Sequence, residues 1–120
     1  MNSIVEPTNI GLSETNHQWL TRFKEDQIFS EMADAYRFAV AYALSKEIDP
    51  PEISDKRRTI FGVATIDPNK EIFTVVTCLM PNLTGSIYQM VEKLADWGIA
   101  DMAKLYSQGK LDIASLITVN

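Results

Sequence analysis

The hydrophobic pattern of the chain is densest between residues 29 and 45, FSEMADAYRFAVAYALS. From Met32 to Leu44 almost every position is apolar, so a helix through this stretch is hydrophobic on all sides. It is too short to span a membrane, which takes roughly 20 apolar residues. A helix of this kind must be covered on more than one side, by other elements or by a second copy of itself. The pattern therefore predicts a buried helix over about residues 30–47, with Ser30 as its N-cap.

Two shorter elements are predicted before this helix. Residues 8–12 alternate between polar and apolar, with Ile10 and Leu12 on one face, as in a short strand. Ser13 then suits the N-cap of a helix that ends near residues 24–27. The predicted order is strand, helix, turn, helix.

The middle of the sequence, residues 59–80, allows two interpretations. Its β-branched residues and the Asp67-Pro68-Asn69 turn signal suit a β-hairpin. However, Asp67 as N-cap, Pro68 at the first helical position and Glu71 in the first turn are typical of a helix start. We expect the helix, with the hairpin as the alternative.

The clearest helical stripe covers residues 86–106. Gly98 lies in its middle, where glycine is unfavourable, so it marks a kink or the close approach of another helix. Gln108-Gly109 suits a left-handed C-terminal cap, and residues 111–119 form a short amphipathic tail. The sequence thus predicts a single, mainly α domain over residues 1–120, with a strand-helix-helix part at 7–46 and a helical part at 59–119.

Composition and charge narrow the range of functions. The chain has 120 residues, 46% apolar and 22% charged, which is typical of one globular domain. Its net charge of −5 argues against broad, non-specific attraction to nucleic acid. The N-terminal residues lack the basic and long apolar regions of a secretory signal, so a cytoplasmic location is expected, with no membrane association.

Candidate catalytic and metal-binding residues are few. Cys78 is the single cysteine and His17 the single histidine, so one chain cannot assemble a Cys/His metal cluster. Cys78 lies in an apolar run and is expected to be buried. Glu92 and Asp96 lie four residues apart, on what is expected to be the solvated face of a helix. The sequence predicts no metal, no cofactor and no enzymatic activity.

The remaining candidates are cationic. Arg37 lies within the buried helix, where an ion pair with Asp34 is the simplest explanation. A ligand pocket formed by Arg37 and Tyr36 is the alternative. Lys56, Arg57 and Arg58 form a loop cluster that could contact phosphates.

The N-terminal third resembles a known family. TNIGLS at residues 8–13, a helix, a turn and then FSEM before the alanine-rich helix resemble the ribbon-helix-helix arrangement over residues 7–46. In that family two chains pair their short strands and interlock their second helices, so the resemblance implies a homodimer. The dimer interface would then contain the following residues: Ile10, Leu12, Tyr36, Phe38, Ala39 and Tyr42.

The whole layout has a second resemblance. FSEMADAYRFAVAYALS, a proline-stopped loop, TIDPNKEIF and IYQMVEKLADWGIADMAKLY are together similar to small helical proteins that accompany bacterial DNA phosphorothioation and related DNA-modification or defence systems. This resemblance implies a non-enzymatic accessory or regulatory protein that acts through protein contacts.

DNA binding is expected to be weak. On the outer face of a ribbon, where the family reads DNA, this chain offers Asn9 and no cation. With the cluster at residues 56–58, Asn9 completes the candidate DNA-binding set. Two other functions stay open: an antitoxin-like DNA-binding repressor, and a small ligand-binding or enzyme subunit.

Overall fold

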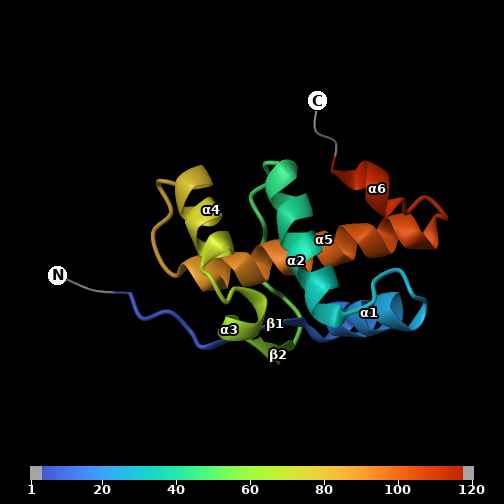
Figure 1. Cartoon of the computed structure of the whole chain (residues 1–120), viewed down its shortest axis with the longest axis horizontal. Coiled ribbons are helices and arrows are strands. Elements are labelled where there is room, and N and C mark those ends of the chain that lie inside the picture. Colours follow the sequence, from blue (N-terminus) through green and yellow to red (C-terminus); the bar gives the residue numbers. More distant parts are fainter. Residues whose placement is uncertain (1–3, 118–120) are drawn as a thin grey trace.

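A long helix, α5 (Ile87–Ser107), runs along the molecule, and the other elements pack around it (Figure 1). The computed structural model describes residues 4–117. Within this range the chain order is β1 (Asn9–Ser13), α1 (Glu14–Glu25), α2 (Met32–Ser45), β2 (Arg57–Gly62), α3 (Val63–Ile66), α4 (Glu71–Leu79), α5 and α6 (Ile113–Leu116). The fold is mainly α, as predicted.

Helix α5 forms where the sequence predicted it. The Ser86 hydroxyl caps it by accepting from the backbone N–H of Gln89 at 3.1 Å. Gly98 marks the crossing of α5 and α2, because a Cβ at this position would lie 2.4 Å from the carbonyl oxygen of Ala39. Gly109 takes the left-handed conformation with φ of 69° after the helix end. The predicted close approach and C-terminal cap are both confirmed.

Helix α2 is covered by the chain itself. Its largest contact is with α5, and it also packs against α1 and α3. The predicted N-cap is wrong, since the helix starts at Met32 and Ser30 makes no cap. Glu31 takes the capping position in an extended conformation without a side-chain cap bond, so Ser30 lies one residue too early.

The strand β1 pairs antiparallel with β2, with Ile10 opposite Phe61 and Leu12 opposite Arg58. A bulge lies between Ile10 and Gly11, where the strands come so close that a Cβ at Gly11 would lie 1.8 Å from the carbonyl oxygen of Arg58. The ribbon-helix-helix resemblance implied pairing with a second chain. In this structure the partner strand belongs to the same chain.

Five of the six residues assigned to a dimer interface are consequently in the interior. Ile10, Leu12, Tyr36 and Ala39 are fully buried, and Tyr42 is 3% exposed. Phe38 is half-buried and its ring packs against Phe29. One chain covers these side chains, which removes the reason for assigning them to an interface between two copies.

The middle segment, residues 59–80, forms the end of a strand and two helices, α3 and α4, but no hairpin. Helix α4 starts at Glu71, and Asp67 accepts from the backbone N–H groups of Ile72 and Phe73 at 2.9 and 3.0 Å. Asp67 therefore helps to start this helix, but the predicted N-cap is wrong, since Lys70 takes the capping position and Pro68 lies before the helix. The strand before it, β2, pairs with β1 and not with a neighbouring strand.

The N-cap of α1 is Ser13, as predicted. The Ser13 hydroxyl accepts from the Asn16 backbone N–H at 3.2 Å and so caps α1. The predicted amphipathic tail contains α6, while its last residues, 118 and 119, lie outside the described residues. Within residues 4–117, no helix is both long and apolar enough to cross a membrane.

Candidate functional site

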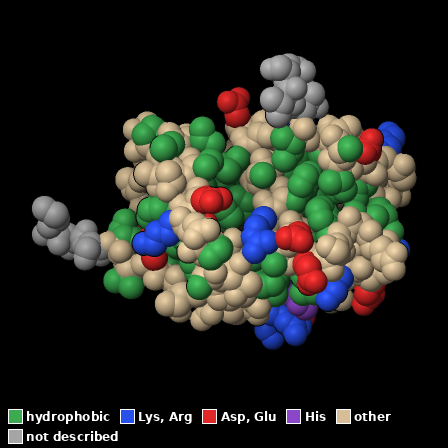
Figure 2. Space-filling model, viewed as in Figure 1, with side chains coloured by type: hydrophobic (Ala, Val, Ile, Leu, Met, Phe, Trp, Pro, Cys, Tyr) green, Lys and Arg blue, Asp and Glu red, His purple; other side chains and the backbone are tan. Residues whose placement is uncertain are grey.

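An apolar groove lies between α2 and α4. Figure 2 shows hydrophobic side chains gathered over α4 and over the space between α4 and α2. The groove consists of two hollows of about 250 and 310 Å³ that share Leu44. The first is lined by Arg37, Val40, Ala41, Leu44, Glu71, Ile72 and Val75, and the second by Leu44, Glu47, Ile48, Leu79 and Met80. We call both together the α2–α4 groove.

Helix α4 exposes much of its apolar surface beside this groove. Val75 is 45% and Leu79 is 60% exposed, although neither residue carries a polar atom on its side chain. Cys78 is also exposed, so the prediction that it is buried is wrong. The apolar run around Cys78 does not imply burial, because only the other side of α4, including Val76, faces the core.

Arg37 borders the groove but is already engaged. Its Nη1 donates to Asp34 at 2.8 Å, which confirms the predicted ion pair. Its Nε and Nη2 donate to the backbone carbonyls of Ile66 and Thr65 at 2.9 and 2.7 Å, at the end of α3. Arg37 thus ties α2 to α3, which a sequence pattern cannot show.

Tyr36 does not share a pocket with Arg37. Its ring is fully buried, and its hydroxyl donates to the Gly11 carbonyl at 2.9 Å. Burial raises the pKa of Tyr36 well above its usual value, and the nearby negative charge of Glu92 adds to this effect. The alternative of a joint Arg37 and Tyr36 ligand site therefore fails on geometry.

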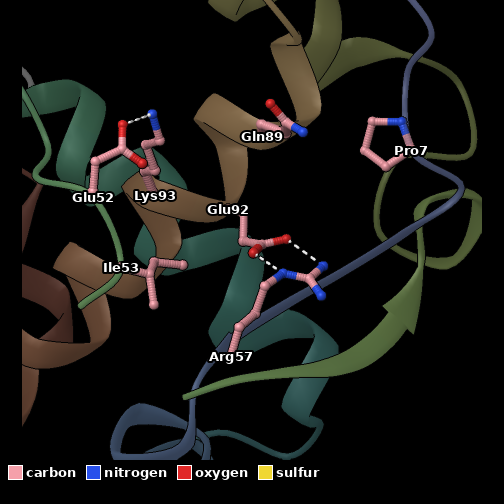
Figure 3. Close-up of a pocket in the computed structure, with 7 residues that line it drawn as sticks. All are labelled: Pro7, Glu52, Ile53, Arg57, Gln89, Glu92 and Lys93. Carbon is pink, nitrogen blue, oxygen red and sulfur yellow. Dashed lines mark hydrogen bonds and ion pairs between the residues drawn. The ribbon is translucent and has the colours of Figure 1, made fainter. Parts of the chain in front are cut away.

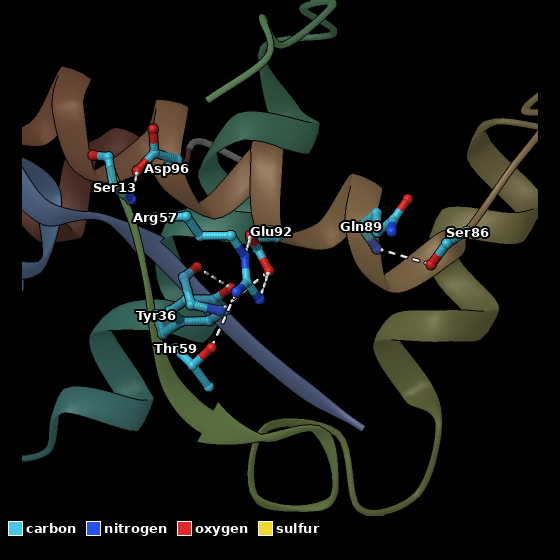
Figure 4. Close-up of polar contacts among 9 residues, drawn as sticks. Ser13, Tyr36, Arg57, Thr59, Ser86, Gln89, Glu92 and Asp96 are labelled. Carbon is cyan, nitrogen blue, oxygen red and sulfur yellow. Dashed lines mark hydrogen bonds and ion pairs between the residues drawn. The ribbon is translucent and has the colours of Figure 1, made fainter. Parts of the chain in front are cut away.

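Side chains of α5 complete the outer edge of β1 (Figure 4). The backbone N–H of Gly11 donates to Glu92 at 3.2 Å, and that of Ser13 donates to Asp96 at 2.8 Å. An edge strand otherwise presents unpaired polar groups. The expectation that Glu92 and Asp96 lie on a solvated face is wrong: Glu92 is 5% exposed and Asp96 is half-buried.

Arg57 of β2 binds the Glu92 carboxylate at the same edge. Its guanidinium meets Glu92 in a bidentate ion pair, in which Nη2 lies 2.8 Å from Oε2. Its Nη1 also donates to the Thr59 hydroxyl at 3.0 Å. The hydrogen bond to Glu92 raises the pKa of Arg57. Arg57 is thereby fixed in one orientation.

A cleft opens beside this ion pair (Figure 3). It has a volume of about 440 Å³ and lies between α5, the first residue of β2 and the loop that precedes it. A second ion pair lines it, in which the Nζ of Lys93 lies 2.6 Å from Glu52. We call it the α5–β2 cleft, and its lining residues are Pro7, Glu52, Ile53, Arg57, Gln89, Glu92 and Lys93.

The predicted DNA-binding residues do not form one cationic surface. Arg57 is engaged by Glu92, and Arg58 forms an ion pair with Glu14 at 3.3 Å. Lys56 is exposed and precedes β2, and Asn9 is exposed at the start of β1. Two of the three cations are thus paired with carboxylates, so the cluster carries little net positive charge toward a phosphate backbone.

The structure and the comparisons do not point to a known type of site. Among residues 4–117, no group of three or more His, Cys, Asp or Glu side chains is arranged to hold a metal ion. The chain has no significant match to a family model, a curated protein or a solved structure. The groove and the cleft are therefore interpreted from their own chemistry.

Proposed function

We propose that the protein is a non-enzymatic accessory or regulatory protein that binds another protein through the α2–α4 groove. The observation that carries this proposal is the exposure of Val75 and Leu79 beside the two hollows of the α2–α4 groove, most of whose lining residues are apolar. Exposed apolar surface next to a concave site is typical of protein contact surfaces. The layout resemblance to accessory proteins of bacterial DNA-modification systems supports a partner from such a system.

The shape and charge of the groove favour an amphipathic helix with basic flanking residues. Helices bind in apolar grooves through side chains spaced three, four and seven residues apart. The two hollows carry Glu71 and Glu47, while the α4 residues from Ile72 to Leu79 carry no charge. Basic residues beside the apolar face of the partner would meet these two carboxylates. Arg37 offers little opposing charge, since it is paired with Asp34.

A photo-crosslinking experiment in cells that naturally make the protein tests this proposal. A photoreactive phenylalanine analogue would replace Leu79, and a matched control would place it at Lys24, an exposed position on α1. We expect the probe at residue 79 to trap one partner protein within an amphipathic, basic-flanked helix. The same probe combined with Val75→Asp should lose this product, because a charge would enter the apolar contact.

The outcomes separate the possible occupants. If the probe traps a second copy of the chain, the groove forms a homodimer and does not bind a partner protein. Equal products from residues 79 and 24, or a product that survives Val75→Asp, would contradict the proposal.

A further inference from the structure

The α5–β2 cleft is a second concave surface, distinct from the α2–α4 groove. Its volume of about 440 Å³ lies within the range of small-molecule sites, roughly 300–1,000 Å³. Two cations line it, Arg57 on β2 and Lys93 on α5. The two cations differ in how firmly their carboxylate partners are held.

The carboxylate of Glu92 is part of the fold. It is nearly buried, it accepts from the backbone of Gly11, and it holds Arg57 in a bidentate pair. The Arg57 side chain is nevertheless 43% exposed, so part of it borders the cleft. A planar guanidinium fixed in this way can still donate to a second oxygen ligand from its exposed side.

The carboxylate of Glu52 is peripheral by comparison. Its side chain is 84% exposed, while that of Lys93 is 25% exposed. Figure 3 shows Glu52 reaching Lys93 from the loop on one side of the cleft. Exposed ion pairs contribute little to stability, so another carboxylate could replace Glu52 at Lys93. The cleft would then hold two cations against one carboxylate, Glu92.

We propose that the α5–β2 cleft binds a small dicarboxylate. One carboxylate takes the place of Glu52 at the Nζ of Lys93, and the other contacts the exposed side of the Arg57 guanidinium. The side-chain amide of Gln89 supplies a further donor, and Ile53 and Pro7 provide apolar walls for the methylene carbons. Glu52 thus competes with the ligand for Lys93, and its ion pair shows that Lys93 can bind a carboxylate at this position.

Nuclear magnetic resonance titration with succinate at constant ionic strength tests this proposal. Backbone amide signals of Gln89 and Lys93 should shift saturably with succinate, and much less with acetate, which has one carboxylate. Lys93→Gln should weaken succinate binding about ten-fold, as expected for loss of a charged hydrogen bond. Glu52→Gln should tighten it by up to about five-fold, because it removes the competitor.

Matched controls separate a specific site from general charge effects. Lys104→Gln and Glu25→Gln make the same charge changes at exposed positions on α5 and α1. They should leave succinate binding unchanged, as should Val75→Asp, which tests the groove independently of the cleft. The proposal is overturned if the shifts do not saturate, if acetate binds as well as succinate, if Lys104→Gln equals Lys93→Gln, or if Glu52→Gln weakens binding.

Discussion

Replacing Gly98 by alanine tests the central crossing of the fold. The added methyl group would lie 2.4 Å from the carbonyl oxygen of Ala39, 2.9 Å from its carbonyl carbon and 3.0 Å from its Cα. Ordinary van der Waals contacts are at least 3.4 Å, and these atoms belong to the backbone, which cannot rotate away. The two helices would therefore have to separate by roughly 1 Å, which weakens contacts along their interface.

The size of the effect follows from two opposing contributions. Alanine is favoured over glycine within a helix by about 1 kcal/mol. Overpacking a core costs about 1–3 kcal/mol, and a backbone clash lies at the upper end of this range. We expect Gly98→Ala to lower the free energy of unfolding by about 2 kcal/mol.

Urea unfolding followed by circular dichroism measures this change. Ala100→Gly is the matched control, because Ala100 is exposed on the same helix and reports helix propensity without packing. It should lose about 1 kcal/mol. A Gly98→Ala variant as stable as the wild type, or more stable, would refute the close crossing of α5 and α2.

Three further variants probe other parts of the structure. Glu92→Ala should lower the free energy of unfolding, measured in urea, by about 2–3 kcal/mol. This is less than the loss of a fully buried ion pair would cost, because Arg57 is partly exposed. An unchanged free energy of unfolding would contradict the role of Glu92 at the β1 edge. Burial, and then the hydrogen bond to Asp101, raise the pKa of Tyr42 to about 12 in the folded protein. The stability that this protonated hydroxyl contributes is therefore complete below its pKa in the unfolded chain, about 10, and is lost as the pH rises through 12. The free energy of unfolding, measured across this pH range, should therefore fall less steeply with pH in Tyr42→Phe than in the wild type. Some slope remains in the variant, because the pKa values of Tyr36 and Tyr88 are also raised. Identical slopes would contradict the raised pKa of Tyr42. Cys78 should react with a thiol reagent almost as fast in the native as in the unfolded protein, and Cys78→Ser should change the unfolding free energy by less than about 0.5 kcal/mol; a slow native reaction would mean that the thiol is covered.

Local signals were sufficient to predict most helices. Ser13 caps α1 as predicted, the apolar stripe located α5, and Asp67 helps to start α4 although Lys70 is its N-cap. Gly98 could be recognised as a contact point because glycine is unfavourable in a helix without such a reason. The caps depend on residues close together in the sequence, whereas Gly98 signals a contact without showing that Ala39 makes it.

Features that depend on distant segments could not be predicted in the same way. The strand β2 has few apolar residues of its own, and it forms because β1 lies beside it. The all-round apolar surface of α2 showed that a cover was needed, but not that α5 supplies it within one chain. That cover is why most of the residues assigned to a dimer interface are interior residues.

The candidate sites were the least predictable part. Glu92 and Asp96 resemble a solvated acidic pair in the sequence, whereas their partners are backbone N–H groups of Gly11 and Ser13, whose positions no side-chain pattern reveals. Cys78 and Leu79 resemble core residues because hydrophobicity alone does not show which side of α4 faces outward. Both candidate surfaces arise from segments that folding brings together.

The most direct test is the dependence of stability on protein concentration. Unfolding midpoints in urea would be measured over a wide dilution series, with the solution mass determined by light scattering in parallel. Because one chain pairs β1 with β2 and covers α2 with α5, we expect the midpoint to be independent of concentration and the dilute protein to remain a folded monomer. A midpoint that falls with dilution would contradict this, since it would mean that a second copy completes the core.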